Sequence, residues 1–418
     1  MKIVKICVGS LLLASIGLNT YAADSLSEAL KSGKFNGELK GIYYDVDKGT
    51  SKESIISLGV MLRYVTAPYY GFSLGFRARA SSSPWANDKE KAFYKADLYG
   101  PGAVLEEAYL KYQLNKTTLK AGRQYIKTPL LAGNGSRIVH ESFMGYTANI
   151  KDIPKSRIFV GYVNRYLTRT DFLEGNAKTR IGNFRKNVFM YGVKYEYKMK
   201  DGLWTVLLQN QSVKGLKLTG QYLLLKNATT KTGVAMGDIS VALAQAEYKL
   251  PLQGFPLLLG VQYGSSDVDK DNSRSGDLVG FKVATKYNGL MASLGYVIDS
   301  NDKGMVSGVG ISSNWAYAGD IIGLESYQKD TDALSLNLKY NFAKVGVKGL
   351  MMLGRYTNYN VGSNSTLNGG KDLNAYDFVT RYAFNGQLKG FSVKFHFEDV
   401  DFDTNPIKNY RLYLVYKF

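Results

Sequence analysis

Alternation between apolar and polar side chains is the dominant pattern along this chain. From Tyr410 to Phe418, every second position is apolar or aromatic, and the positions between them include Arg411 and Lys417. Because successive side chains of a strand point to opposite faces, this stretch predicts a strand with one apolar face and one mostly polar face. Such a strand suits the wall of a membrane barrel, which has lipid outside and water inside.

The same alternation recurs in other runs, which are separated by connections of two kinds. Clear runs lie at 72–79, 119–122, 189–197, 281–287, 334–342 and 391–398. Short turns are expected near Pro68, Asn115, Pro154, Gly202, Gly289, Lys344 and Gly386, and long polar loops at 81–103, 167–187, 267–277, 300–332 and 358–373. Bacterial outer-membrane barrels have short periplasmic turns and long extracellular loops.

The number of strands depends on one ambiguous region. About nineteen strand-like runs can be counted, whereas single-chain bacterial barrels have an even number of strands. In the region 204–237, the run 216–225 could be a wall strand or an extension within a loop. Merging there predicts an all-β fold, a transmembrane antiparallel β-barrel of about 18 strands, with sixteen as the alternative.

The N-terminus predicts export. Lys2 and Lys5 precede an apolar run over 6–18, and Ala22 offers a small-residue cleavage site. This pattern is typical of a secretory signal peptide at residues 1–22, which would leave a barrel domain over residues 23–418. Cys7, the only cysteine, lies in the signal peptide. The mature chain would therefore carry no thiol for a disulfide, a metal or a nucleophile.

Charge and composition narrow the expected partners. The chain has 53 Lys and Arg against 35 Asp and Glu, a net charge of +18. In a soluble protein this excess would favour nucleic acid, but in an exported barrel a basic lumen attracts anions. We therefore expect small solutes, outer-membrane lipid and lipopolysaccharide as partners, and no nucleic acid. The terminal aromatic strand also resembles the sorting signal that the barrel-assembly machinery reads, with Phe418, Tyr416, Leu414, Leu412 and Tyr410 as its residues.

One segment resembles a known family. The stretches 119–129, 132–138 and 143–147 look like the strand, constriction loop and following strand of the OprD family of outer-membrane porins. The resemblance implies an eighteen-stranded, monomeric or loosely trimeric porin, which passes carboxylate-bearing nutrients such as amino acids along a ladder of basic residues. By this resemblance, Arg137 and Ser136 are expected to line the constriction of the pore, and Lys120 is expected to line the lumen below it. Arg123 fits this ladder of basic residues less well, because it is an even number of residues from Leu119 and Ala121 and should therefore point outward as they do.

The alternation of inward and outward side chains along the strands predicts further cations in the lumen, independently of the family resemblance. A few cations near a permeating anion can favour its passage without trapping it. The alternative is that these charges only solvate the lumen or pair with Glu38, Glu107, Glu196, Asp377 and Glu398. The inward positions are Arg77, Arg79, Lys120, Lys282, Lys286, Lys339, Arg381, Lys394 and Arg411.

Few residues in the sequence have the spacing of a catalytic or metal-binding site. A hydrolase built into the barrel would have to use His140 or His396, the only histidines. The alternating Asp267, Asp269 and Asp271 are followed by Asn272 where a helix-loop-helix calcium site needs glycine. We therefore expect no cofactor, no metal and no enzymatic activity. The favoured hypothesis is a passive outer-membrane porin for small anions; a barrel-embedded hydrolase and a surface adhesin or structural barrel stay as alternatives.

Overall fold

The computed structural model describes residues 23–95, 97–169, 184–191, 195–252, 254–300, 302–319 and 327–418. The predicted signal peptide at 1–22 lies outside the described residues. The helices are short: α1 (Leu26–Lys31), α2 (Asp88–Tyr94) and the 3-10 turns η2 (Asn272–Arg274), η3 (Phe342–Val345), η4 (Leu367–Gly369) and η5 (Gly386–Leu388). None of the described helices is long and apolar enough to cross a membrane.

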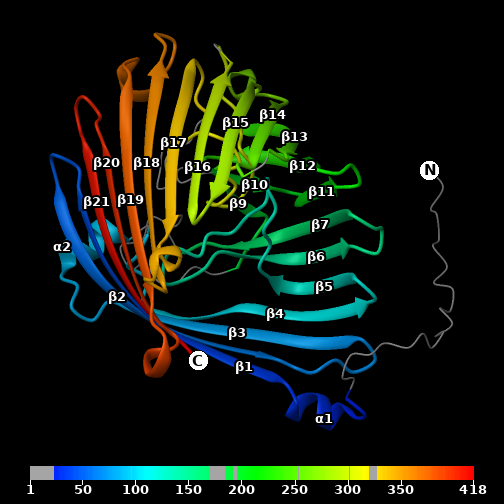
Figure 1. Ribbon diagram of the computed structural model, residues 1–418. Coiled ribbons are helices and arrows are strands. Elements are labelled where there is room, and N and C mark those ends of the chain that lie inside the picture. The colour runs from blue at the N-terminus through cyan, green and yellow to red at the C-terminus, as the bar shows by residue number, and fades with distance from the viewer. Residues whose placement is uncertain are drawn as a thin grey trace, which may run out of the picture.

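Eighteen antiparallel strands form a closed barrel (Figure 1). Closure is direct, because β1 pairs with β21 from Glu38 opposite Lys417 to Asp47 opposite Lys408. The predicted fold class and strand number are therefore confirmed. The wall strands are β1 (Lys34–Asp47), β2 (Lys52–Val65), β3 (Phe72–Ser82), β4 (Gly102–Leu114), β5 (Thr117–Gln124), β6 (Ser142–Ile150), β7 (Ser156–Leu167), β11 (Leu203–Asn210), β12 (Leu216–Thr230), β13 (Ala235–Leu250), β14 (Leu257–Val268), β15 (Asp277–Tyr287), β16 (Leu290–Asp299), β17 (Thr331–Asn341), β18 (Leu350–Val361), β19 (Leu373–Ala383), β20 (Phe391–Val400) and β21 (Ile407–Lys417).

Three short strands lie between β7 and β11 and explain the surplus run in the sequence. They are β8 (Arg185–Lys186), β9 (Val188–Tyr191) and β10 (Tyr195–Met199). β8 pairs with the end of β7, β9 pairs with β10, and β10 pairs with the end of β12, while β11 itself pairs with β7 and β12. The predicted wall strand at 189–197 is therefore wrong, and the ambiguous run 216–225 belongs to the wall.

Connections at the two ends of the barrel differ in length. At one end, the short-turn end, strands are joined by tight turns such as Asn288–Gly289, where both residues have positive φ (41° and 89°). An Asn-Gly pair suits the type I′ turn that matches the twist of a hairpin. At the opposite, long-loop end the described parts of the connections are 83–95, 97–101, 125–141, 168–169, 184–191, 195–202, 302–319 and 327–330. The predicted turn at Gly202 is an exception, because it lies at the long-loop end, between β10 and β11.

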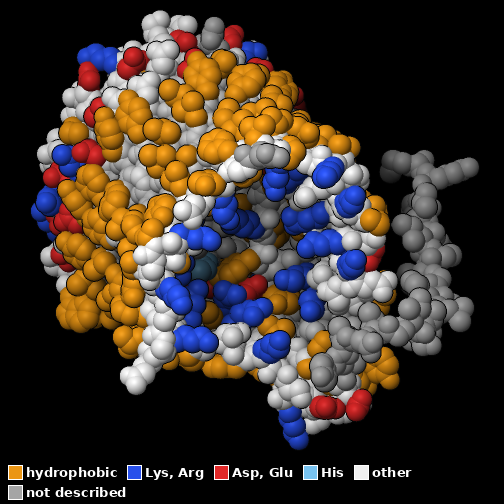
Figure 2. Space-filling model, viewed as in Figure 1, with side chains coloured by type: hydrophobic (Ala, Val, Ile, Leu, Met, Phe, Trp, Pro, Cys, Tyr) orange, Lys and Arg blue, Asp and Glu red, His pale blue; other side chains and the backbone are white. Residues whose placement is uncertain are grey.

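The wall has an apolar outer face and a polar inner face. Along β3, Phe72, Leu74 and Phe76 are exposed on the outside, whereas Ser73 and Arg79 are buried on the inside. In the C-terminal strand, Tyr410, Leu412, Leu414 and Phe418 are likewise exposed outward, with Tyr416 partly covered by stacking on Phe391 (ring centroids 4.3 Å apart). Figure 2 shows the resulting continuous hydrophobic outer surface. The assembly role of these residues stays a prediction.

Candidate functional site: the basic lumen and its constriction

Two long loops fold into the barrel and dock on each other. The segment 125–141 follows β5, and 302–319 follows β16. Their backbones bond directly, since the Ala132 N–H donates to the Val309 carbonyl (3.0 Å) and the Val309 N–H to the Leu130 carbonyl (2.9 Å). The prediction that 300–332 is wholly an extracellular loop is therefore wrong for 302–319, because its apolar side chains are buried inside the barrel.

Glycines in the wall make room for the second loop. A Cβ on Gly264 would lie 1.9 Å from Cη2 of Trp315, and one on Gly295 would lie 2.1 Å from the Tyr317 carbonyl oxygen. The Trp315 indole is held in this position by donating from Nε1 to the Ser307 carbonyl (2.7 Å). Only glycine permits such a close approach. These glycines therefore position one side of the constriction.

Arg137 lies inside the barrel, but it is not a free cation. Its Nε and Nη2 donate to the two carboxylate oxygens of Asp97 (2.8 and 2.7 Å), and Arg169 donates to the same carboxylate (2.6 Å). Its guanidinium also lies 5.0 Å from the Tyr44 ring centroid. Burial disfavours a charged Asp97, yet Arg137 and Arg169 hold its pKa below the usual value. The prediction that Arg137 meets permeating solute is corrected: its charge anchors the constriction loop.

The neighbours of Arg137 complete this anchor. Ser136 donates from Oγ to Asn134 Oδ1 (2.6 Å) and accepts from Arg137 Nη1 (3.1 Å), so its hydroxyl shapes the loop. Lys40 on β1 donates from Nζ to the carbonyls of Arg137 (2.7 Å) and Gly135 (3.1 Å). The sequence reasoning missed Lys40, because nothing local in β1 indicates that a distant loop will supply its partners.

Arg77 and Arg79 face inward as predicted, but both are neutralised. Arg79 lies between Glu38 (3.0 Å) and Glu106 (2.8 Å), and Arg77 contacts Glu107 at 2.7 Å. A bulge in β4, opposite the Arg77–Ala78 step, turns both glutamates into the lumen. Parity alone could place only one of two consecutive residues inside, so Glu106 was missed.

Four cations on β4, β5, β19 and β20 face the lumen without a carboxylate partner among the described residues. Lys111 and Lys120 are opposite each other on β4 and β5, and Arg381 and Lys394 are opposite each other on β19 and β20. Lys120 lies over the Tyr109 ring (4.2 Å) and Lys394 over the Tyr413 ring (4.0 Å). Within the described ranges, no carboxylate forms a salt bridge with any of the four. Figure 2 shows Lys and Arg side chains around the mouth that faces the viewer.

The other predicted cations differ in their surroundings. Lys282 pairs with Glu247 (2.8 Å), which also contacts Lys217 (3.2 Å), so its charge is offset. Lys286 is exposed at the short-turn end of β15. Arg123 is wrong as a pore residue, because it keeps the outward parity of its strand: its guanidinium lies over the Phe184 ring at 4.5 Å.

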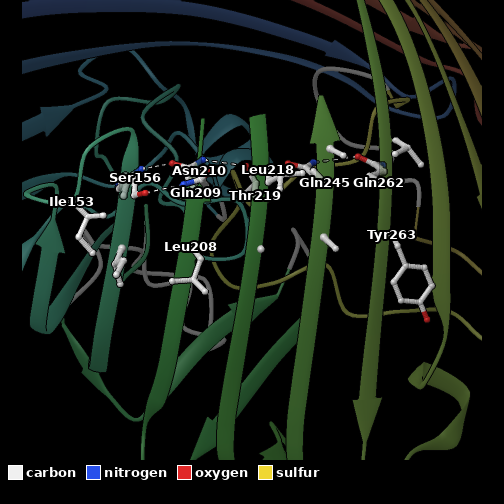
Figure 3. A pocket seen from close by; sticks show the side chains of 16 residues that line it. Ile153, Ser156, Leu208, Gln209, Asn210, Leu218, Thr219, Gln245, Gln262 and Tyr263 are labelled. Carbon is white, nitrogen blue, oxygen red and sulfur yellow. Dashed lines mark hydrogen bonds between the residues drawn. The ribbon is translucent and has the colours of Figure 1, made fainter. Parts of the chain in front are cut away.

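The opposite wall is lined by amides and hydroxyls, which also bind the inward-facing Arg157. Arg157 donates to Asn149 Oδ1 (2.8 Å) and Gln209 Oε1 (3.4 Å), and Gln209 Nε2 donates to Thr219 Oγ1 (3.4 Å). Gln245 and Gln262 continue this row across β13 and β14, as Figure 3 shows. The two walls therefore differ: Lys111, Lys120, Arg381 and Lys394 have no carboxylate partner among the described residues, whereas on the facing wall Arg157 is hydrogen-bonded to amides and Lys217 and Lys282 are paired with Glu247.

Neither histidine is arranged as a catalytic base. Burial lowers the pKa of His140 well below its ordinary value, with nearby Arg79 adding to the effect, so the ring is neutral. His396 Nε2 lies 3.0 Å from Asp377 Oδ1 in a buried pair. In the part of the chain that the structure describes, no serine hydroxyl is hydrogen-bonded to either ring. Nor do the described residues contain a group of three His, Cys, Asp or Glu side chains that could hold a metal.

Comparison with known proteins agrees with this architecture. A family model described as outer membrane porin, OprD family, matches residues 94–418. The fold resembles that of Acinetobacter baumannii OccAB2 (TM-score 0.77, 17% identity, covering 94% of this chain and 99% of that chain) and of Pseudomonas aeruginosa OpdQ (TM-score 0.71, 20% identity, 94% and 99%). It also resembles P. aeruginosa OccK9, or OpdG (TM-score 0.77, 14% identity, 93% and 99%). No curated protein sequence matches the chain.

The family match covers most of the chain, and the solved porins share its closed eighteen-stranded wall. Members of the family are channels of the Gram-negative outer membrane for small solutes, so the short-turn end is periplasmic and the long-loop end extracellular. The resemblance noted in the constriction segment is thus confirmed across the barrel: the chain belongs to the OprD family of outer-membrane porins.

Proposed function

We propose that this porin favours small anions, and in particular carboxylate-bearing nutrients, over cations and neutral solutes. The observation that carries the proposal is the imbalance of pairing on the inner wall. Glu38, Glu106 and Glu107 are each bound to an arginine. Lys111, Lys120, Arg381 and Lys394 face the lumen without such a partner among the described residues.

The expected energies suit diffusion and not tight capture. A cation 4 Å from an anion contributes about 1 kcal/mol in bulk water and about 4 kcal/mol at an effective dielectric of 20. Solvated cations spaced along a wall therefore attract an anion repeatedly without holding it at one place. The neutral amides on the facing wall can donate and accept hydrogen bonds, so they suit a carboxylate that carries other polar groups.

A porin with the same fold has been solved with a carboxylate. P. aeruginosa OccK2 (OpdF), 15% identical to this chain with a TM-score of 0.73, was solved in complex with glucuronate, a sugar carboxylate. At this identity the likeness shows the fold alone. The proposal for this chain therefore depends on its own cations, and glucuronate is a reasonable member of a test panel.

The test is ion selectivity in planar bilayers. We expect an anion-selective reversal potential in a salt gradient for the mature protein. Lys111→Glu with Lys120→Glu should reduce the anion-to-cation permeability ratio by about fivefold or more, since a change of about 1 kcal/mol corresponds to that factor. Lys155→Glu with Lys214→Glu, an equal total charge change on the exposed turns 151–155 and 211–215, should leave the ratio unchanged.

Liposome swelling extends the test to nutrients. Glucuronate and acidic amino acids should enter faster than neutral sugars of similar size, and the double variant should lose this difference. Equal swelling rates in the unmodified porin would contradict the anion preference. Absence of any conductance would instead favour an adhesin or structural barrel.

A further inference from the structure

The outer face of β5 to β8 carries a row of cations at the extracellular edge of the barrel. In the strand register Arg123 is opposite Met144, Met144 is opposite Arg165, and Arg165 is opposite Lys186. All four point outward, so three cations lie along a strip about 14 Å wide, given about 4.8 Å between strands. We call Arg123, Arg165 and Lys186 the outer basic row.

The outer basic row differs from other outward cations near the extracellular end. Lys52 pairs with Asp45 (4.0 Å), Lys408 with Asp399 (3.4 Å), and Lys226 with Asp238. In the row, Arg123 donates to the Leu105 carbonyl (3.3 Å) and lies over Phe184. No carboxylate among the described residues forms a salt bridge with any of its three members.

The row lies at the membrane boundary. Tyr146 and Trp204 are 65% and 50% exposed on the outer face, and Tyr162 contacts Trp204 with ring centroids 4.5 Å apart. Exposed tyrosine and tryptophan mark the interfacial girdle of membrane barrels. Tyr146 is two residues from Met144 on the periplasmic side, a distance of about 7 Å along the strand. The outer basic row is thus just outside the aromatic girdle, at the depth of outer-leaflet headgroups.

An apolar groove runs from the girdle toward the middle of the membrane. It has a volume of about 410 Å³ and is lined mainly by apolar and aromatic side chains. Small side chains form its floor, because Ala121 and Ala148 are flanked by Leu110, Leu119 and Val160. A groove of this kind on the outer surface suits an acyl chain, whereas a water-soluble nutrient has no route to it.

We propose that the outer basic row and this groove bind a phosphate-bearing glycolipid of the outer leaflet, of the lipid A type. Its phosphates would accept hydrogen bonds from Arg123, Arg165 and Lys186, and one acyl chain would occupy the groove. Arginine is suited to this role, since its guanidinium donates in a bidentate manner to phosphate. The site is independent of the solute preference proposed above, because it lies on the opposite face of the wall.

The experiment is a lipid titration of the detergent-solubilised mature porin, followed by native mass spectrometry. Bisphosphorylated lipid A should bind the unmodified protein. The triple variant Arg123→Gln, Arg165→Gln, Lys186→Gln should bind it at least about tenfold more weakly, because the charge-assisted hydrogen bonds to the phosphates are lost. Fully dephosphorylated lipid A should bind the unmodified protein as weakly as the triple variant binds the phosphorylated lipid.

A matched control replaces three outward cations that already have carboxylate partners: Lys52→Gln, Lys226→Gln, Lys408→Gln. This variant should bind lipid A like the unmodified protein. If the row variant fails to fold, Arg165→Gln alone and Ala148→Phe, which fills the groove, should each weaken lipid binding. Ion selectivity should be unchanged in every row variant.

Four results would overturn the proposal. One is equal binding of lipid A by the unmodified protein and the row variant. Another is equal binding of phosphorylated and dephosphorylated lipid. The third is a row variant whose lipid binding is intact but whose oligomeric state has changed, since the face would then be a contact between copies of this chain. Competition by inorganic phosphate alone at lipid-like concentrations would likewise assign the row to free anions and not to a lipid.

Discussion

The two halves of the barrel wall are lined in different ways. One half, from β17 through β21 to β5, faces the lumen with cations, and its carboxylates hold Arg77 and Arg79 in place. The other half, from β6 to β16, packs its inward apolar side chains against those of the inward loops, and these contacts make up most of the main buried cluster of the protein. A single closed sheet therefore provides a charged surface for solute on one side and a packed support on the other.

The comparison shows two ways to hold a loop inside a water-filled barrel. On the charged half, the end of segment 125–141 is fixed by the ion pair of Arg137 with Asp97 and by Lys40. On the covered half, the other inward loop is fixed by close packing against glycines, as Trp315 shows against Gly264. The ion pair and hydrogen bonds of the first loop can persist beside water. The contact of Trp315 with Gly264 depends instead on a close fit between the two surfaces.

The largest effect is expected from Arg137→Gln, which removes the bidentate partner of Asp97, a half-buried residue. Breaking a fully buried ion pair by removing one partner costs about 3–5 kcal/mol, and the cost here is lower because Asp97 is partly exposed and keeps Arg169. We expect segment 133–141 to exchange amide hydrogens faster and the open channel to become noisier. Lys91→Gln is the control, because its partner Asp88 is on the surface; this variant should behave like the unmodified porin. Unchanged exchange in the Arg137 variant would show that Lys40 alone suffices to hold the loop.

The covered half can be broken by Gly264→Val. The new side chain would overlap the Trp315 ring, and overpacking of this kind costs about 1–3 kcal/mol. We expect Trp315 to leave its site, with altered indole fluorescence and a larger single-channel conductance. Gly354→Val, at a wall glycine where a Cβ would meet no atom within 4 Å, should change neither quantity. A conductance that stays the same after Trp315 has moved would separate loop docking from pore width.

Neighbouring strands allow the inner and outer faces to be compared directly. Lys394 on β20 points into the lumen, while Lys408 on β21 points outward and pairs with Asp399. Lys394→Glu should reduce anion preference by roughly fivefold, the factor for about 1 kcal/mol. Lys408→Glu should leave the reversal potential as it was. An equal loss in both variants would mean that overall charge, and not the lumen face, sets selectivity.

The smallest effect is a pH dependence of loop order. The pKa of Asp97 is depressed, so its contribution to loop stability is full above the ordinary aspartate pKa of 3.8 and is lost as pH falls below it. Burial raises the pKa of Glu141, against the opposing effect of Arg169, so its contribution has the opposite sign and declines as pH rises through that raised pKa. Amide exchange of 133–141 should show both trends.

The variant Glu141→Gln separates the contribution of Glu141 to this pH dependence from that of Asp97. The Glu141 carboxylate accepts from the Asn134 and Ile311 N–H groups (2.8 and 3.0 Å), and the amide oxygen of glutamine can accept from both. In this variant the decline at higher pH should disappear, while the loss below pH 3.8 should persist. Persistence of the decline at higher pH would assign it to another group.

The alternation of apolar and polar residues was sufficient to predict the extended strands and their two faces. It was insufficient to predict where the segments between the wall strands lie. The run at 189–197 alternates as well as any wall strand, yet its described residues, 189–191 and 195–197, lie in the short strands β9 and β10 at the extracellular end. Alternation shows that a segment is extended with two unlike faces, but the pairing partner decides whether it is in the wall. For the same reason 302–319 looked like an ordinary polar loop, because the glycines that receive it are on distant strands.

From the sequence alone followed the membrane barrel and the inward or outward face of its strand residues, because both depend on a period of two that neighbouring residues set by themselves. The family followed from the motifs within 119–147. The number of eighteen strands was correct, but the pairing partners, and not alternation, decided that 216–225 belongs to the wall and 189–197 does not. Only the tertiary structure decided which cations meet solute. Arg79 and Arg137 are neutralised by carboxylates brought in from other segments, while Lys120 and Lys394 are not. Charge pairing acts across space between residues far apart in the chain, so no local pattern encodes it.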